Sequence, residues 1–189
     1  HEPDLWQVQI SLIINYLPYA FFLFHVQNVY VVGAAQSEFG AFPDESYRSL
    51  FSSAFENAVE SVDKNFDRTE VDEAFIGTLG VGGRQLGLSG PAVTEYVGLN
   101  GTPSTRVENA CAASGVALRQ AVTSIRAGVS DIAVAGGVEI MTDMSGEQTR
   151  YWLGVSGETE WERMAGTTFA GVYAQMASGQ IGRAVQQEC

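Results

Sequence analysis

The sequence contains very little lysine and few basic residues of any kind. Of its 189 residues, 10 are Lys or Arg and 22 are Asp or Glu, the formal net charge is -12, and Lys64 is the single lysine. Such an acidic surface repels phosphate groups, which argues against nucleic acid and anionic membrane surfaces as partners. Because salt screens the repulsion between like charges, this composition is typical of a halophilic protein, with neutral drift as the alternative.

Cysteine and histidine are also scarce. The two cysteines, Cys111 and Cys189, lie far apart in the sequence and form no disulfide framework, a usage that fits a reducing cytoplasm. The two histidines, His1 and His25, do not combine with cysteines or carboxylates at the spacing of metal ligands. We therefore expect a cytoplasmic protein with no metal site.

Long hydrophobic runs are missing, with one exception near the N-terminus. Residues 10–26 are mostly apolar, but Asn15 and Pro18 interrupt them. The run is shorter than the roughly 20 residues of a spanning helix and lacks the basic flank of a signal peptide, so we expect no membrane role. We interpret residues 1–28 as an extension, either packed on the main domain or translated from upstream of the true start near Val29.

From residue 29 onward, strand-like and helix-like segments alternate. Runs of β-branched and apolar residues predict strands at residues 29–36, 71–79, 104–110 and 131–139. Apolar residues at helical spacing predict helices at residues 47–62, 91–100 and 111–128, with Gly101 ending the second. This alternation predicts an α/β domain with a largely parallel sheet. Beyond Met141 the pattern fades into an excursion, with one short helix predicted from Phe169 to Ala177.

Cys111 is the residue whose surroundings suggest chemistry. It lies where the predicted strand 104–110 meets the next helix, and free N–H groups and the helix dipole stabilise an anion at such a position. A thiol there ionises more readily, and the thiolate is the reactive form. The small residues around it leave room for a substrate, but they equally suit tight packing around a structural cysteine. From these residues alone, both interpretations stay open.

Two short stretches carry a resemblance to a known family. The run "VENACAASG" surrounds Cys111, and the run "AVAGGVEIM" follows it about two dozen residues later. They resemble the thiolase motifs Asn-x-Cys-Ala-Ser-Gly, which holds the nucleophile at the start of a buried helix, and Gly-Gly-x-Glu, which ends the next strand. The first motif carries one extra alanine here. The matching residues are Asn109, Cys111, Ser114, Gly115, Gly136, Gly137 and Glu139. The opening "VYVVGAAQSEFGAF" is similar to the archaeal and sterol-carrier branch of that family.

The resemblance implies a thiolase-like layered α/β fold, of which this chain holds the N-terminal half. Residues 29–141 would form the N-terminal α/β domain and residues 142–177 the start of the inserted loop domain. Residues 1–28 and 178–189 diverge from the family pattern. Because thiolases pair through the strand that precedes the nucleophile, the resemblance also implies a homodimer built on Ser104 to Ala110.

The function implied is that of an acyltransferase of lipid metabolism. Cys111 would attack an acyl-CoA thioester, hold the acyl group and pass it to CoA or to the carbanion of a second acyl-CoA, with its own backbone N–H as one oxyanion donor. Acyl-CoA and CoA are substrates, and no cofactor is implied. Thiolases take their remaining catalytic groups from Asn-Glu, Gly-His-Pro and Cys-x-Gly motifs of the C-terminal half, which do not occur here. We therefore expect the chain alone to be inactive.

Several alternatives stay open beside this interpretation. A β-ketoacyl synthase also uses a cysteine at such a joint, a hydroxymethylglutaryl-CoA synthase fits the motifs less well, and a truncated chain could serve as a non-catalytic subunit. The glycines of residues 77–87 have the spacing of a turn and not of a phosphate loop. We interpret residues 158–163 as a solvated face and Glu139 as structural. Met141 and Met144 would line an acyl channel or simply pack.

Overall fold

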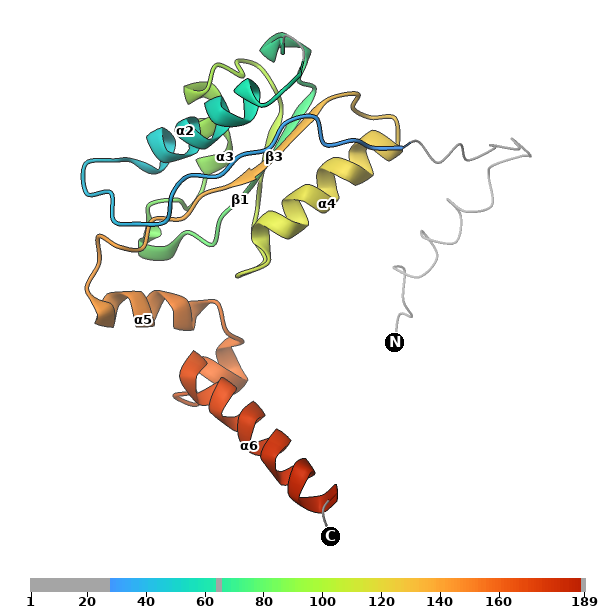
Figure 1. Cartoon of the computed structure of the whole chain (residues 1–189). Coiled ribbons are helices and arrows are strands. Elements are labelled where there is room, and N and C mark those ends of the chain that lie inside the picture. Colours follow the sequence, from blue (N-terminus) through green and yellow to red (C-terminus); the bar gives the residue numbers. More distant parts are fainter. Residues whose placement is uncertain (1–27, 64–65, 188–189) are drawn as a thin grey trace, which may run out of the picture.

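A three-stranded parallel sheet forms the centre of the protein. The computed structural model describes residues 28–63 and 66–187. The strands β1 (Glu73–Gly77), β2 (Ser104–Val107) and β3 (Ala133–Gly137) lie in the order β2-β1-β3 (Figure 1). Both pairings are parallel. The predicted parallel α/β class is therefore confirmed, although each of these strands is shorter than its predicted range.

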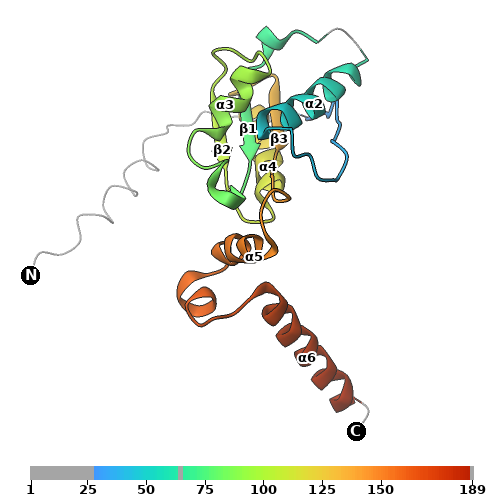
Figure 2. The ribbon, with the colours of Figure 1, turned by 90° about the vertical axis from the view of Figure 1, so that its left-hand side faces the viewer.

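Three helices cover the two faces of this sheet. They are α2 (Tyr47–Glu60), α3 (Ser89–Tyr96) and α4 (Ala113–Arg126). Helices α2 and α3 lie on one face and α4 on the other, which produces three layers (Figures 1 and 2). Short 3₁₀ turns, η1 (Arg68–Glu70) and η2 (Val81–Gly83), precede and follow β1.

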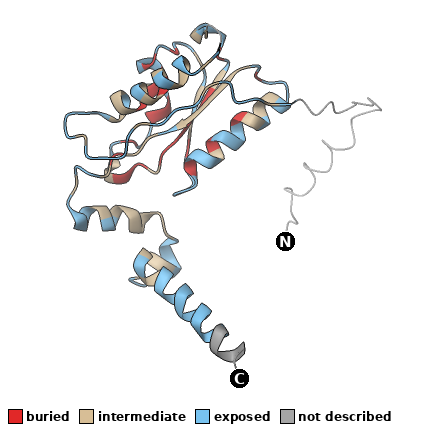
Figure 3. Cartoon of the chain, viewed as in Figure 1, coloured by how far each residue is buried: buried red, intermediate tan, exposed pale blue. Residues whose placement is uncertain are grey.

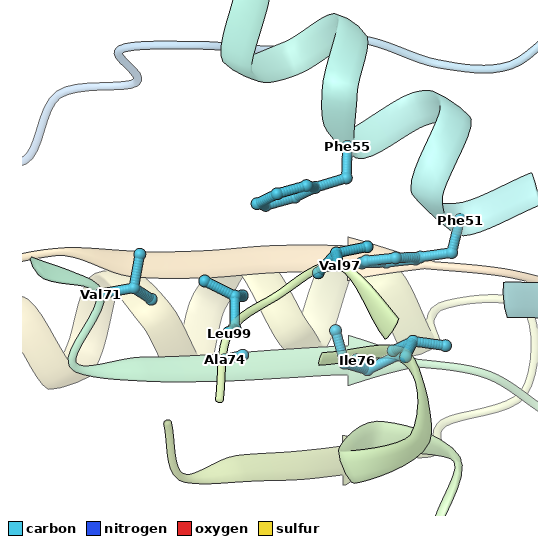
Figure 4. Close-up of a cluster of buried hydrophobic side chains, with 8 residues drawn as sticks. Phe51, Phe55, Val71, Ala74, Ile76, Val97 and Leu99 are labelled. Carbon is cyan, nitrogen blue, oxygen red and sulfur yellow. The ribbon is translucent and has the colours of Figure 1, made fainter. Parts of the chain in front are cut away.

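Side chains from alternate positions of β1 build the two halves of the core. On one face, Ala74 and Ile76 contact a cluster that includes Phe51 and Phe55 of α2 (Figure 4). On the other face, Phe75 packs with Val107 and with the buried alanines of α4, Ala117 and Ala121. Side chains of a strand alternate between its two faces, and alanines four residues apart lie on one face of a helix. Phe75 of β1 and the alanines of α4 therefore face each other.

The ends of the predicted helices are largely as expected. Ser46 caps α2 in a reciprocal pair of hydrogen bonds with Ser49. Helix α3 ends at Tyr96 and is followed by Gly98 in the left-handed region, at φ 79°. Gly98 and not the predicted Gly101 therefore ends this helix, since a glycine adopts this conformation at little steric cost.

The predicted strand at residues 29–36 is wrong. These residues are extended but unpaired, and the side chains of Tyr30 and Val31 are each 75% exposed. Together with α2 and β3, the segment lines a cavity of about 1090 Å³. Its main tie to the domain is through Ala34, whose N–H donates to Ser61 Oγ at 3.0 Å. A strand needs a hydrogen-bonded neighbour, and these residues have none in the sheet β2-β1-β3.

Beyond β3 the chain leaves the sheet and forms α5 (Gly146–Val155), a π-helical turn η3 (Thr159–Arg163) and α6 (Phe169–Gln187). These elements extend away from the three layers and contain no buried residue among those described (Figure 3). Helix α5 is absent from the sequence prediction, and α6 extends ten residues past the predicted end at Ala177. Across the described residues, no helix combines the length and the apolarity that crossing a membrane requires.

Candidate active site around Cys111

Cys111 lies on the short connection between β2 and α4. The strand ends at Val107 and the helix begins at Ala113, so the cysteine directly precedes the N-cap residue, Ala112. Its thiol is free and exposed. The predicted position at a strand-to-helix joint is thus confirmed, and within the described residues the cysteine is not part of the buried core.

The chain turns sharply immediately before the cysteine. Ala110 has φ 47°, and no other described residue except glycine has a positive φ. Its N–H donates to Glu108 Oε1 at 2.6 Å, and its carbonyl accepts from the N–H of Ala113 at 3.2 Å. A left-handed alanine is strained by roughly 1–2 kcal/mol, so the surrounding contacts must hold it in place. Strain of this kind is concentrated at functional sites in proteins.

Two glycines at the ends of neighbouring strands make room for the first turn of α4. A Cβ atom added at Gly77 would lie 2.6 Å from the backbone nitrogen of Ser114. One added at Gly137 would overlap Ser114 Oγ. The helix therefore begins in direct contact with the ends of β1 and β3, and this contact explains why glycine is needed at both positions.

The N-terminus of α4 has no side-chain cap. Its N-cap residue, Ala112, offers no hydrogen-bonding side chain, and none accepts from the first turn. The N–H groups of an uncapped helix end carry partial positive charge and can stabilise a nearby anion. Cys111 directly precedes this end of the helix, where a thiolate and a developing oxyanion would both gain from those groups.

Glu139 lies two residues past β3 and binds the turn that follows β1. Its Oε2 accepts from the N–H groups of Leu79 at 2.9 Å and Gly80 at 3.3 Å and from Thr78 Oγ1 at 3.1 Å. Its Oε1 accepts from the N–H of Val81 at 2.6 Å. With both oxygens occupied in this way, Glu139 holds the turn together, which agrees with the structural role expected of it.

The glycine-rich segment after β1 is a tight turn. Gly80, Gly82 and Gly83 all have a positive φ, between 77° and 84°. Met144 lies against Gly82, since its Sδ is 2.8 Å from where a Cβ would stand, and Trp152 of α5 lies 3.5 Å from the same position at Gly83. Met144 therefore packs on the turn, and the contact between α5 and this turn has no signal in the local sequence.

Among residues 28–63 and 66–187, no group of three His, Cys, Asp or Glu side chains could hold a metal ion. The remaining candidates named from the sequence, His1, His25 and Cys189, lie outside the described residues. Trp161, in the acidic run 158–163, is 82% exposed.

Comparison with known proteins agrees with the resemblance that the two motif stretches carry. The family model "Thiolase, N-terminal domain" matches residues 29–188. The chain is 38% identical over 155 residues to an acetyl-CoA acetyltransferase of Methanocaldococcus jannaschii and 34% identical over 154 residues to one of Methanothermobacter thermautotrophicus. These matches cover 80% of this chain, which spans 38% and 39% of the two relatives.

A solved structure of acetyl-CoA acetyltransferase from Syntrophomonas wolfei matches 55% of this chain and 26% of its own, with 24% identity and a TM-score of 0.47. The family match itself extends over most of the chain and includes both motif stretches, the turn at Cys111 and the strand that leads to Glu139. The chain belongs to the thiolase family.

Proposed function

We propose that Cys111 is the acyl-accepting nucleophile of a thiolase-type acyltransferase that acts on acyl-CoA. The observation that carries this proposal is the exposed thiol at the uncapped N-terminus of α4, directly after a strained turn. A thiolate is stabilised at such a position, and the thiolate is the nucleophilic form of cysteine. The names of the two archaeal relatives, both acetyl-CoA acetyltransferases, support acetyl-CoA as the substrate.

In the proposed reaction, the Cys111 thiolate adds to the thioester carbonyl and forms a tetrahedral oxyanion. The oxyanion collapses, the bond from the carbonyl carbon to the CoA sulfur breaks, and CoA leaves as a thiolate that takes up a proton. The acyl group stays on Cys111 as a thioester. N–H groups at the helix start, including that of Cys111, would stabilise the oxyanion.

Completing the transfer needs further groups. A base must deprotonate the second substrate, and general acid–base help of this kind is worth about 10²- to 10⁴-fold. Neither His1 nor His25 lies within the matched residues 29–188. We therefore propose that this chain by itself accepts an acyl group but does not turn over, and that a separately supplied C-terminal half of a related enzyme restores thiolysis.

The first half-reaction can be tested directly by intact-mass spectrometry. The chain is incubated with acetyl-CoA or with an acetylated acyl-carrier protein, and we expect the mass of one acetyl group to be gained from acetyl-CoA. Cys111→Ala should abolish the gain, whereas the matched control Cys189→Ala should keep it. Acetylation from the carrier protein alone would favour a β-ketoacyl synthase. No acetylation of folded protein from either donor would contradict the proposal and favour a non-catalytic subunit.

We also propose that the protein is a homodimer, paired through β2. This strand pairs with β1 on one side, and no described strand lies on its other side. An open strand edge presents unpaired N–H and C=O groups that a second copy can satisfy. Pairing there would bring two copies together close to the turn that carries Cys111.

A further inference from the structure

Two consecutive peptide groups lie between a carboxylate and a guanidinium. In the peptide that joins Thr78 to Leu79, the N–H donates to Glu139 Oε2 at 2.9 Å, and the carbonyl accepts from Arg106 Nη2 at 3.1 Å. The peptide that joins Leu79 to Gly80 repeats the arrangement, with 3.3 Å to Glu139 and 3.1 Å to Arg106. Each peptide thus receives a negative group at its N–H and a positive group at its carbonyl.

We propose that Glu139 and Arg106 are a positioning pair, which acts through these two peptides to hold the turn of residues 78–83 in place. The two residues come from the two outer strands of the sheet, since Arg106 is part of β2 and Glu139 follows β3. Neither forms a direct ion pair with the other among the described residues. Their charges are linked only through the turn that leaves the central strand.

The signs of the two charges make their effects cooperative. Hydrogen bonds to ionised groups are roughly twice as strong as those between neutral groups. A carboxylate at the N–H and a cation at the carbonyl polarise a peptide in the same direction, so each hydrogen bond strengthens the other. Both hydrogen bonds to the turn come from Arg106 Nη2, whereas the Nε of the same guanidinium is buried without a hydrogen-bond partner.

The turn of residues 78–83 also contacts the segment that leads into α5 and lies next to the start of α4. Met144 and Trp152 lie against Gly82 and Gly83, so the position of the turn determines where α5 begins to leave the sheet. At its other end the turn continues from Gly77, on which Ser114 lies. The first peptide that the positioning pair holds, between Thr78 and Leu79, therefore begins one residue after Gly77, where the start of α4 is in contact with β1. This last step, toward the reactivity of Cys111, rests on the proposed function.

The pair can be tested in the full chain by amide hydrogen exchange of residues 79–81. We expect Glu139→Gln and Arg106→Gln each to speed this exchange by about tenfold, because each variant removes the charge from the hydrogen bonds that hold these peptides. The double variant should be little faster than either single variant, and Arg106→Lys should recover part of the protection. Exchange at Ala74 in β1 should not change, nor should any of these amides in the exposed control Glu95→Gln.

A second measurement follows α5. In a Trp6→Phe, Trp161→Phe background, Trp152 is the only tryptophan, and both single variants should increase its quenching by acrylamide. Unchanged exchange in the single variants would overturn the pair, and so would a double variant whose effect is the product of the two singles. Arg106→Lys, which keeps the charge, allows this comparison even if Arg106→Gln folds poorly.

The proposed function is separated from the positioning pair by the iodoacetamide reactivity of Cys111. We expect Cys111 of the unmodified protein to react faster than a free thiol, and Cys111 of both variants to react more slowly than in the unmodified protein. Reaction like a free thiol, with the exchange result unchanged, would remove the proposed function and keep the pair. A primed Cys111 whose reactivity ignores both variants would remove the link between the pair and the cysteine.

Discussion

The backbone nitrogen of Ser114 lies so close to Gly77 that a Cβ atom added to this glycine would be only 2.6 Å from it. The end of the central strand and the start of α4 are therefore in direct contact, with no side chain between them. Backbone cannot move aside as the end of a flexible side chain can, so this contact fixes the position of the turn that holds Cys111.

Substituting Gly77 should consequently displace the start of α4. We expect Gly77→Ala to lower the free energy of unfolding by about 1–3 kcal/mol, the usual effect of overpacking. Urea unfolding measures this change. Gly115→Ala is the matched control, because that position in α4 has no atom within 4 Å of an added Cβ. It should raise stability by up to about 1 kcal/mol through helix propensity. Equal effects of the two substitutions would contradict the close contact.

The strained turn at Ala110 predicts an unusual response to glycine. At φ 47°, glycine relieves the steric strain, so Ala110→Gly should leave stability unchanged or raise it by up to about 1 kcal/mol. At Ala112, where φ is -93°, glycine gains nothing and should lower stability by about 0.5–1 kcal/mol. The difference between the two variants in urea unfolding tests whether Ala110 is left-handed.

Glu73 links the start of β1 to the end of α4 and predicts a pH dependence of stability. Hydrogen bonds from Ser124 and from Ser130, the latter at 2.6 Å, lower the pKa of this carboxyl from its ordinary 4.5. A lowered pKa in the folded state stabilises the protein above pH 4.5, and this contribution is lost as the pH falls through the folded-state value. Glu73→Gln should weaken that part of the acid-induced loss. A parallel pH profile for wild type and variant would contradict this assignment.

The excess of acidic groups predicts stabilisation by salt. With a net charge of -12, repulsion within the folded chain should weaken as KCl is added, so the midpoint of thermal unfolding should rise. Calorimetry at low and high KCl measures this effect. Sucrose, which stabilises folded proteins without screening charge, serves as a control for general solvent effects. A midpoint that stays flat or falls with KCl would count against halophilic adaptation.

Pairing through β2 predicts a dimer in solution. Sedimentation at high salt should give twice the mass of the chain, and dilution should shift it toward the monomer. Ser104→Pro, at the start of β2, should weaken association, because the backbone groups of residues 103 and 107 bond to β1 and those of residue 104 therefore face the open edge. Retained folding, checked by circular dichroism, separates this effect from unfolding. Well-folded wild-type protein that is strictly monomeric would rule out the proposed pairing.

Local sequence was sufficient to predict much of the fold and the location of Cys111. The helix at Tyr47, the three paired strands and the joint before α4 all follow from periodicity, caps and short motifs, which act over a few residues. Helix α5 was missed although Ser145 and Gln148 carry the pattern of a capping box. That signal was present, but the surrounding glycines and acidic residues obscured it.

Relationships between distant segments could not be predicted in this way. Residues 29–36 have the composition of a strand, yet they remain unpaired, and together with α2 and β3 they line a cavity. Glu139 was identified as structural, but its hydrogen bonds reach residues about 60 positions earlier, and its link to Arg106 depends on the order of the three strands. Composition sets what a segment can form. Whether it does so depends on which neighbours the packed chain brings within hydrogen-bonding distance.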